Sequence, residues 1–429
     1  MRVAFTTLGC KVNQYETENL SELFAADGFE VVDPSDFADV YVINSCTVTA
    51  SGDKKTRQLL RRLKKQNPAA AAALTGCFPQ AFPDAAEAIP EADVITGSSN
   101  RGDVLPAVKE ALATGKRVVR ILPHERGEKF EHMSVTGLRG RTRAFVKIED
   151  GCDRYCSYCI IPKARGPVRS KPLNEIREEL SALAENGYRE VVLVGVNLSS
   201  YGKEIGLRLI DAVQAACRTE GIRRVRLGSL EPELLTAEDI RAMAAEEKFC
   251  PQFHLSLQSG CDKTLREMNR HYDSAEYARI VSDIRAAFEN PSITTDVMVG
   301  FAGETEADFE ESLSFVQKIG FAKVHVFSYS RRPGTSADKR PGQVPSSVKE
   351  ERSRRMIEAT DATRKQFLLG QLGKTEEVLV ETTKSPLGYE GFTKNYTPVY
   401  VSCDPALCGN VVKMRLEAVL EGHCVGTLL

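Results

Sequence analysis

Apolar and polar positions over the first 113 residues alternate in a pattern typical of a parallel sheet with crossover helices. Short apolar runs, as expected for buried strands, are separated by amphipathic stretches such as ETENLSELFAADG. The strand-like runs are VAFTTL, DVYVINSC and AAALTGC. We therefore predict an amino-terminal α/β domain, residues 1–113, built on a doubly wound parallel sheet.

A second, longer alternation covers residues 141–370. Helix-like segments such as NEIREELSALAENG follow the first five of its six strand-like segments. The strand-like segments are AFVKIE, EVVLVGVN, RRVRLGS, FHLSLQS, ITTDVMVG and KVHVFSYS. Six βα units predict a partial (βα)6 barrel, and its chemistry should lie at the carboxyl ends of the strands.

The other two segments have different patterns. Residues 114–140 mix glycine, charge and histidine without a clear period, which predicts a linker with His124 and His132 exposed. Residues 371–429 have strand-like alternation with glycine and proline turns, which predicts a small antiparallel β-barrel. With 429 residues and 42% hydrophobic content, the chain is long enough for two or three domains.

The amino terminus, MRVAFTTLGCKVNQYE, fits a buried strand better than a secretory signal. No segment has 18 consecutive apolar residues. We therefore expect a soluble, cytoplasmic protein without a membrane partner.

Three cysteines follow directly after the three strand-like runs of the amino-terminal domain: Cys10, Cys46 and Cys77. The ends of parallel strands lie at one edge of the sheet, where open α/β sheets place their sites. The pattern is consistent with a cysteine triad at that edge. The alternative is three unrelated core cysteines.

A second triad, Cys152, Cys156 and Cys159, follows the first strand of the predicted barrel with the spacing C-x3-C-x2-C. In a reducing compartment, clustered cysteines are more often metal ligands than disulfides. Structural zinc needs four ligands, and the nearest histidine in sequence, His132, lies twenty residues upstream of Cys152. A 4Fe-4S cluster held by three thiolates instead leaves one iron open to a small molecule. The remaining cysteines are expected to be small buried or neutral residues: Cys217, Cys250, Cys261, Cys403, Cys408 and Cys424.

Positive charge is concentrated in two runs, although the net charge is only −2. Residues 54–65 contain seven Lys or Arg and no acid, and RGRTR at 139–143 leads towards the second triad. Each run is either a solvated face or a contact surface for a polyanionic partner.

The C-x3-C-x2-C loop after the first barrel strand is similar to that of radical S-adenosylmethionine enzymes. This resemblance implies that S-adenosylmethionine chelates the open iron of the 4Fe-4S cluster and yields a 5′-deoxyadenosyl radical, so Cys152, Cys156 and Cys159 would be catalytic. The segments VGVNLSSYG, LSLQSG and DVMVGFAGET resemble those that hold the cofactor, although each alone also fits an ordinary strand-end loop. By this resemblance the cofactor-binding residues are Gly195, Asn197, Ser256, Gln258 and Gly300.

The whole chain resembles the methylthiotransferases, which have an amino-terminal domain with three cysteines, a radical S-adenosylmethionine core and a carboxyl-terminal TRAM domain. The resemblance implies a second 4Fe-4S cluster, held by Cys10, Cys46 and Cys77, that carries or delivers sulfur. The segments TLGCKVNQYET, DGCDRYCSYCIIPKARGPVRS and HLSLQSGCDKTLREMNRHY are similar to the branch that acts on N6-threonylcarbamoyladenosine at position 37 of tRNA. Lys163 departs from this pattern, because an aromatic residue commonly follows CIIP.

The implied reaction attaches a methylthio group to carbon 2 of the adenine. Its C–H bond has no acidity that a side-chain base could use, so a radical is required. One S-adenosylmethionine would donate the methyl group and another would be the radical source. The implied partners are the tRNA anticodon loop, a sulfur source and an electron donor such as flavodoxin or ferredoxin. A cation should pair with the threonylcarbamoyl carboxylate, and the candidates are Arg165, Arg169, Arg331 and Arg332.

Three alternatives remain. The sister branches of the family act on isopentenyladenosine 37 of tRNA or on a ribosomal-protein aspartate. KVN after Cys10 and the sequence DRYCSYC favour the threonylcarbamoyladenosine branch. Outside the enzymes, the chain would be an iron–sulfur or zinc protein that binds RNA through its tail and basic helix.

Overall fold

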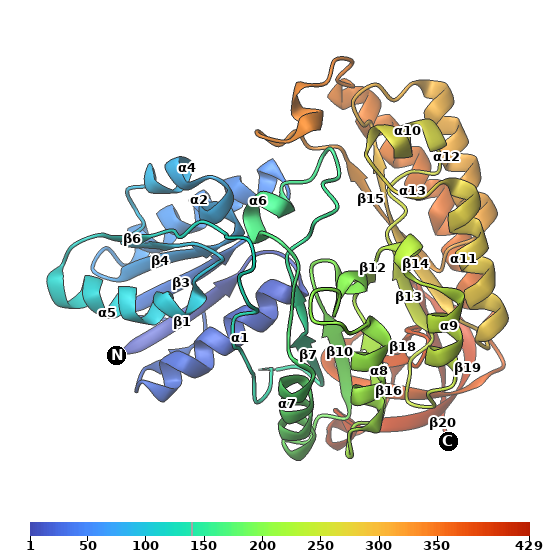
Figure 1. Ribbon diagram of the computed structural model, residues 1–429. Coiled ribbons are helices and arrows are strands. Elements are labelled where there is room, and N and C mark those ends of the chain that lie inside the picture. Colours follow the sequence, from blue (N-terminus) through green and yellow to red (C-terminus); the bar gives the residue numbers. More distant parts are fainter. Residues whose placement is uncertain (139) are drawn as a thin grey trace.

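The computed structural model describes residues 1–138 and 140–429 (Figure 1). The predicted basic run 139–143 therefore includes one position, Arg139, that lies outside the described residues. No helix of the described chain is both long enough and apolar enough to cross a membrane.

The amino-terminal domain is the predicted parallel sheet, with six strands in the order β2-β1-β3-β4-β5-β6. Its strands are β1 (Arg2–Thr7), β2 (Glu30–Val32), β3 (Val40–Ser45), β4 (Ala71–Gly76), β5 (Val94–Thr96) and β6 (Val118–Arg120). Its helices are α1 (Lys11–Ala26), α2 (Ala50–Gln66), α3 (Cys77–Ala81), α4 (Pro83–Glu87) and α5 (Val104–Thr114). Helices α1 and α5 pack on one face of the sheet and α2, α3 and α4 on the other, so the sheet is doubly wound as predicted.

The stretch predicted as a linker contains part of this sheet. Strand β6 (Val118–Arg120) pairs in parallel with β5, so the sheet extends beyond residue 113. Three residues are too few to show a strand period in the sequence, and only the pairing with β5 defines this strand.

The six predicted βα units form a partial barrel made of two parallel sheets, β11-β10-β7 and β12-β13-β14-β15. The strands are β7 (Arg143–Lys147), β10 (Glu190–Val194), β11 (Arg224–Leu227), β12 (Ser229–Leu230), β13 (Gln252–Leu255), β14 (Ser292–Val299) and β15 (Lys323–Ser328). The strand predicted at RRVRLGS is divided into two, β11 and β12, with Gly228 between them. The edge strands β7 and β15 do not pair in the described part of the chain, so the barrel is open between them.

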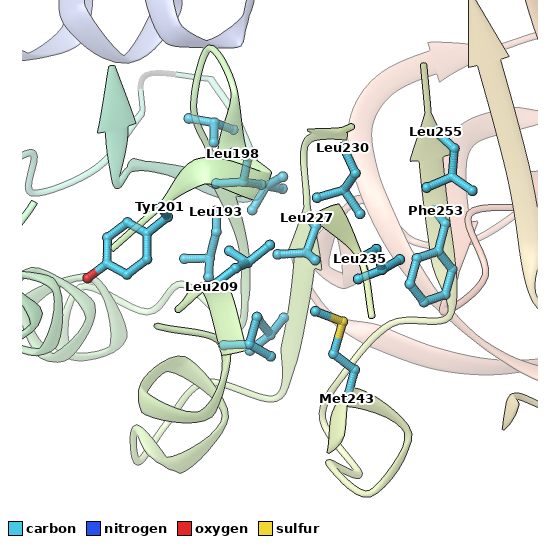
Figure 2. Close-up of a cluster of buried hydrophobic side chains, with 14 of the residues drawn as sticks. Leu193, Leu198, Tyr201, Leu209, Leu227, Leu230, Leu235, Met243, Phe253 and Leu255 are labelled. Atoms are coloured by element: carbon cyan, nitrogen blue, oxygen red, sulfur yellow. The ribbon is translucent and has the colours of Figure 1, made fainter. Parts of the chain in front are cut away.

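Helices cover the outside of this barrel. They are α7 (Leu173–Glu185), α8 (Leu209–Arg218), α9 (Ala237–Ala244), α11 (Ser274–Ala287), α12 (Glu306–Ile319) and α13 (Ser346–Leu369), with the short α6 (Ile161–Arg165), α10 (Asp262–Glu267) and hairpin β8 (Glu149–Asp150)–β9 (Arg169–Ser170) in the loops. Figure 2 shows the packing: Leu193, Leu227 and Phe253 of the strands lie in one apolar cluster with side chains from α8 and α9, such as Leu209 and Met243. This core fixes the strands whose loops carry the site.

The tail is a closed five-stranded barrel in the order β16-β17-β18-β20-β19, as predicted, although β18 and β20 pair in parallel. Its strands are β16 (Thr375–Ser385), β17 (Gly388–Thr393), β18 (Pro398–Val401), β19 (Val411–Leu420) and β20 (His423–Leu428). Two buried arginines of β11 attach it to the larger barrel. Arg224 donates to the carbonyl oxygen of Glu377 and Arg226 to that of Lys394, each at 2.8 Å.

Candidate functional site

We call Cys152, Cys156 and Cys159 the core triad. It lies in the loop after β7 and β8, at the carboxyl end of the partial barrel, as predicted. Gly151 enters the loop with a φ of +88°, and a Cβ there would lie 1.9 Å from the carbonyl oxygen of Pro167, so only glycine fits. Within the loop, the Cys152 amide donates to the carbonyl of Gly166 and the Cys159 amide to that of Cys156. The loop is therefore held in place by its own backbone.

Each sulfur of the core triad has a hydrogen-bond donor. Asn197 Nδ2 lies 3.7 Å from Cys152 Sγ, Arg270 Nη1 lies 3.2 Å from Cys156 Sγ, and the Ile161 amide lies 3.4 Å from Cys159 Sγ. Donors directed at all three sulfurs favour thiolates, the form in which cysteine binds metal. Arg270 lies in the segment HLSLQSGCDKTLREMNRHY, but its distance of 114 residues from Cys156 hid this contact from the sequence.

The amino-terminal triad lies at the carboxyl edge of the doubly wound sheet. Cys10 follows β1, Cys46 follows β3 and Cys77 begins α3 directly after β4. β1 and β3 are neighbours where the strand order reverses, which is the place for a site in this fold. Gly9 packs closely against Cys46. A Cβ at Gly9 would lie only 2.9 Å from Cys46 Cβ.

Arg165, at the end of α6, contacts the amino-terminal triad from the barrel side. Its Nε donates to Cys77 Sγ at 3.1 Å, and its Nη2 donates to Asn13 Oδ1 at 2.6 Å. The same Asn13 oxygen lies 3.6 Å from Cys10 Sγ. Because α6 follows Cys159 by two residues and packs on α3, the two predicted cluster sites adjoin.

A buried ion cluster fixes this junction. Lys147 Nζ lies 2.7 Å from Glu16 Oε1 and 2.6 Å from Asp150 Oδ2, and Arg101 Nη2 lies 2.7 Å from Glu16 Oε1. Burial opposes ionisation of Glu16, but Arg101, Arg165 and Lys147 overcome it and hold the pKa of this carboxyl well below its usual range. The amino-terminal domain and the barrel are thus joined through paired charges.

Burial raises the pKa of Cys77 to about 12 and that of Cys159 also to about 12. These thiols are neutral unless a metal supplies compensating charge. The described residues include no group of three or more Cys, His or carboxylate side chains placed to hold a metal ion. In an iron–sulfur cube, however, each thiolate binds a different iron, and the sulfur donors described above fit such a group.

Two of the predicted cofactor-binding residues lie in the loop after β10. A Cβ at Gly195 would lie 2.5 Å from Glu149 Oε2, so the close packing requires glycine. Asn197 contacts Cys152, and its buried Oδ1 has no hydrogen-bond partner among the described residues. A buried acceptor without a partner next to the triad fits a ligand that donates a hydrogen bond, such as an amino group.

The other three predicted residues also follow barrel strands. The carbonyl of Ser256 accepts a bond of 3.2 Å from Arg270, the same arginine that contacts Cys156. Gly300, with a φ of +71°, precedes Phe301, whose ring lies 6.5 Å from that of Tyr158 in the triad loop. Gln258 has a φ of +65° and pairs with Val297 of β14.

A cavity of about 520 Å³ occupies the interior of the partial barrel. Strands from β7 to β15 line it, together with the start of α1 and Tyr396 of the carboxyl-terminal barrel. Among its described lining residues, five Lys or Arg side chains face one carboxylate, Asp296. These cations are Lys11, Arg141, Arg143, Arg226 and Lys323. We call this space the central cavity.

The charge of the central cavity is predominantly positive. Lys11 is exposed, but desolvation by the cavity wall, aided by Arg143 and Arg226, lowers its pKa to about 8. Burial and the nearby Lys323 also lower the pKa of His325. The guanidinium carbon of Arg226 lies 4.8 Å from the centre of the Tyr396 ring, a cation–π contact in the cavity wall.

The sequence offers four arginines for the substrate carboxylate, and the structure places each of them in an ion pair with the protein: Arg165, Arg169, Arg331 and Arg332. Arg332, for example, is buried with Nη2 2.7 Å from Asp53 Oδ2. These arginines already have anionic partners. The cations of the central cavity are better placed to meet a ligand. Of these, the sequence singled out only Arg141 and Arg143, as part of the basic run 139–143.

The two histidines of the predicted linker differ. His132 is exposed, as predicted. The prediction for His124 is wrong, because its side chain is only 7% exposed. Its Nε2 lies 3.2 Å from Ser98 Oγ and its Nδ1 2.6 Å from Glu128 Oε1, and burial lowers its pKa to about 4.

The six other cysteines are neutral thiols, as predicted. Burial raises the pKa of each of them, and four are buried. Lys163, at the position where an aromatic residue is common, lies 5.2 Å from the ring centre of Phe82. The basic run 54–65 forms most of α2, with Lys54, Lys55 and Arg62 exposed.

Comparison with known proteins agrees with this geometry. Residues 146–316 match the family model of the radical SAM superfamily, and residues 2–97 match that of the uncharacterized protein family UPF0004. The fold resembles the radical S-adenosylmethionine methyltransferase TsrM from Kitasatospora setae, with a TM-score of 0.56 at 13% identity over 79% of this chain and 74% of that one. The partial barrel and its cysteine loop are thus those of a radical SAM protein.

The full-length relatives define the family more narrowly. The chain is 35% identical to the threonylcarbamoyladenosine tRNA methylthiotransferase MtaB of Bacillus subtilis (strain 168), over 96% of this chain and 93% of that protein. It is 34% identical to the tRNA-2-methylthio-N(6)-dimethylallyladenosine synthase of Pelotomaculum thermopropionicum, over 98% and 96%. The chain belongs to the tRNA methylthiotransferase family of radical SAM proteins.

Proposed function

We propose that this protein is an enzyme that attaches a methylthio group to carbon 2 of N6-threonylcarbamoyladenosine at position 37 of tRNA. The observation that carries the proposal is that two cysteine triads, each at the carboxyl ends of parallel strands, lie in adjoining sites in a chain of this family. Two 4Fe-4S clusters and S-adenosylmethionine are the cofactors. We assign one cluster to Cys152, Cys156 and Cys159 and the other to Cys10, Cys46 and Cys77.

The chemistry explains the two sites. No side-chain base can remove the hydrogen on carbon 2, because that C–H bond is not acidic. Cys152, Cys156 and Cys159 would hold the core cluster, which, reduced by one electron from the donor, would supply with S-adenosylmethionine the radical chemistry that removal of this hydrogen needs. The residues of the chain hold the parts in place: Arg270 and Asn197 fix the sulfurs of the core triad, and the barrel excludes water around the base.

The cofactor-binding role of the strand-end loops is part of the proposal. We assign the methionine, ribose and adenine parts of S-adenosylmethionine to the loops that contain Gly195, Asn197, Ser256, Gln258 and Gly300. The unpaired Oδ1 of Asn197 and the glycine required at position 195 support this assignment.

The tRNA is held outside the central cavity. Lys54, Lys55 and Arg62 form an exposed basic face on α2, whose first residue lies four positions after Cys46. Together with the carboxyl-terminal barrel, this face would contact the backbone of the anticodon loop, whose unpaired bases can be turned out into a pocket. We place this reaction in the cytoplasm, with a sulfur source and an electron donor such as flavodoxin or ferredoxin as further partners.

A competition assay tests the substrate. The reconstituted protein receives equal amounts of tRNA with threonylcarbamoyladenosine and tRNA with isopentenyladenosine, and mass spectrometry quantifies both 2-methylthio nucleosides. We expect predominantly the threonylcarbamoyl product. A preference for isopentenyladenosine would favour the branch of the Pelotomaculum relative, and activity only on a ribosomal protein would refute the tRNA assignment. The Cys156→Ala variant, which lacks a ligand of the core cluster, is the control without product.

A further inference from the structure

Three of the five cations in the central cavity have no carboxylate within ion-pair distance in the described part of the chain: Lys11, Arg141 and Lys323. The other two are paired. Arg143 lies 2.9 Å from Glu381, and Arg226 lies 3.0 Å from Glu190. The cavity thus contains positive charge that the protein itself leaves unpaired.

The unpaired cations surround the opening of the barrel. Arg141 lies two residues before β7 and Lys323 is the first residue of β15, and these are the two unpaired edge strands. Lys11, at the start of α1, is next to Cys10 of the amino-terminal triad. A ligand that enters between the edges would therefore meet cations from both sides.

The three unpaired cations are exposed to solvent, so their side chains can turn towards a ligand in the cavity. An anion bound there is attracted by all of them. Of the described lining residues only Asp296 is acidic, and it already lies 3.3 Å from His254 Nε2. The anion that these cations would pair with therefore belongs to a ligand.

This anion is distinct from the carboxylate of S-adenosylmethionine. The core triad follows the carboxyl ends of the strands, whereas Arg141 and Lys323 lie at the amino ends. Along β7 alone, the four residue steps from Arg143 to Lys147 span about 13 Å. The carboxylate of S-adenosylmethionine would be bound at the core triad. It would therefore lie too far from Arg141 and Lys323 to pair with them as well.

We propose that Arg141 and Lys323 bind the carboxylate of the threonylcarbamoyl group and thereby select this modified adenosine over uncharged ones. The inference rests on the proposed function and adds the residues that read the substrate. Guanidinium groups bind carboxylates through two parallel hydrogen bonds, and an ammonium adds a compact charge. The threonylcarbamoyl group is attached to N6 of the adenine, away from carbon 2. When carbon 2 faces the core triad, the carboxylate therefore needs a cation site at a different place.

Binding measurements on three RNAs test this assignment. Anticodon stem-loops of one sequence carry threonylcarbamoyladenosine, its methyl ester or plain adenosine at position 37, and their dissociation constants are measured with the full-length, cluster-reconstituted protein. The test variants are Arg141→Gln and Lys323→Gln. The matched controls are Arg218→Gln and Lys318→Gln, which remove exposed cations from α8 and α12 on the outside of the barrel.

We expect the wild-type protein and both controls to bind the free carboxylate more tightly than the ester. Each test variant should lose about ten- to a hundredfold of its affinity for the carboxylate form, the range for a hydrogen bond to a charged group, and almost none for the ester. Variants that keep the full discrimination would overturn the assignment. An equal loss for all three RNAs would also overturn it and identify the cations as phosphate contacts.

The outcome is separable from that of the proposed function. Product analysis of the wild-type protein on tRNA shows whether the threonylcarbamoyl base is methylthiolated at all. If the wild type forms this product and the variants bind the RNAs with unchanged discrimination, only the cation assignment fails. If the wild type forms no such product, the proposed function itself fails.

Discussion

The Nε of Arg165 donates a hydrogen bond to Cys77 Sγ at 3.1 Å. A second buried arginine does the same for the other triad, since Arg270 Nη1 lies 3.2 Å from Cys156 Sγ. Each proposed cluster therefore has its own guanidinium. Hydrogen bonds to the sulfurs are among the factors that set the reduction potential of an iron–sulfur cluster. We therefore expect separate residues to tune the two proposed clusters.

We expect Arg270→Lys to lower the reduction potential of the core cluster alone and Arg165→Lys that of the amino-terminal cluster alone. Loss of a hydrogen bond worth about 1.4 kcal/mol to the reduced form corresponds to about 59 mV for a one-electron couple. Redox titration followed by electron paramagnetic resonance measures both potentials. Each variant is the control for the other, and a shift of both clusters in either one would contradict separate tuning.

Gly151 and Gly187 form a matched pair for the loop that carries the core triad. Their φ angles are +88° and +90°, but a Cβ at Gly151 would lie 1.9 Å from the Pro167 carbonyl oxygen, whereas nothing lies within 4 Å of one at Gly187. Gly187→Ala should cost only about 1–2 kcal/mol and keep about eight irons per chain. Gly151→Ala should displace Cys152 and leave about four irons. Full iron content in Gly151→Ala would show that the loop tolerates the displacement.

Glu16 should control stability in acid. Its pKa is held below that of the unfolded chain, about 4.3, so its contribution is present above that pH and is lost as the pH falls towards the folded value. Glu16→Gln should cost about 3–5 kcal/mol at pH 7, because it leaves buried cations unpaired. The difference from the wild type should shrink below about pH 4.

Urea unfolding followed by circular dichroism at pH 7 and in acid measures this difference. Glu178→Gln, which changes an exposed carboxylate of α7, is the control and should leave stability unchanged at both pH values. A constant gap between Glu16→Gln and the wild type across this range would mean that Glu16 does not titrate as the ion cluster requires.

The basic face of α2 should govern the salt dependence of tRNA binding. Replacing Lys54, Lys55 and Arg62 by Gln should weaken binding and reduce the slope of log affinity against log salt by about 2, since each lost contact to single-stranded RNA removes about 0.7. Filter binding over a range of salt concentrations measures the slope. A variant with Arg279, Lys318 and Lys365 changed to Gln, on the outer helices, should keep the wild-type slope.

The sequence predicted the parts of this molecule that local pattern determines. Strand-like runs marked β1, β3 and β4, and the rule that parallel strands end at one edge placed Cys10, Cys46 and Cys77 together. The spacing of the core triad is likewise local. These features could be read without knowing any long-range contact.

Contacts between distant segments could not be predicted. Arg270 contacts Cys156 across 114 residues, and His124 is buried by Ser98 and Glu128, which give no sign of this contact in the sequence. Lys11, Arg226 and Lys323 of the central cavity were missed for a related reason. Whether Lys323 faces the interior depends on the register of β15 against β14, and a shift of one residue would turn it outwards.

The walls of the central cavity come from nearly the whole length of the chain, from Lys11 to Tyr396. During translation the amino-terminal domain and the barrel emerge first and fold as units, and Tyr396 of the cavity wall is among the last residues to leave the ribosome. All six cysteines proposed as iron ligands precede residue 160. A chain whose synthesis stops before residue 396 therefore carries every proposed iron ligand but lacks part of the wall of the central cavity.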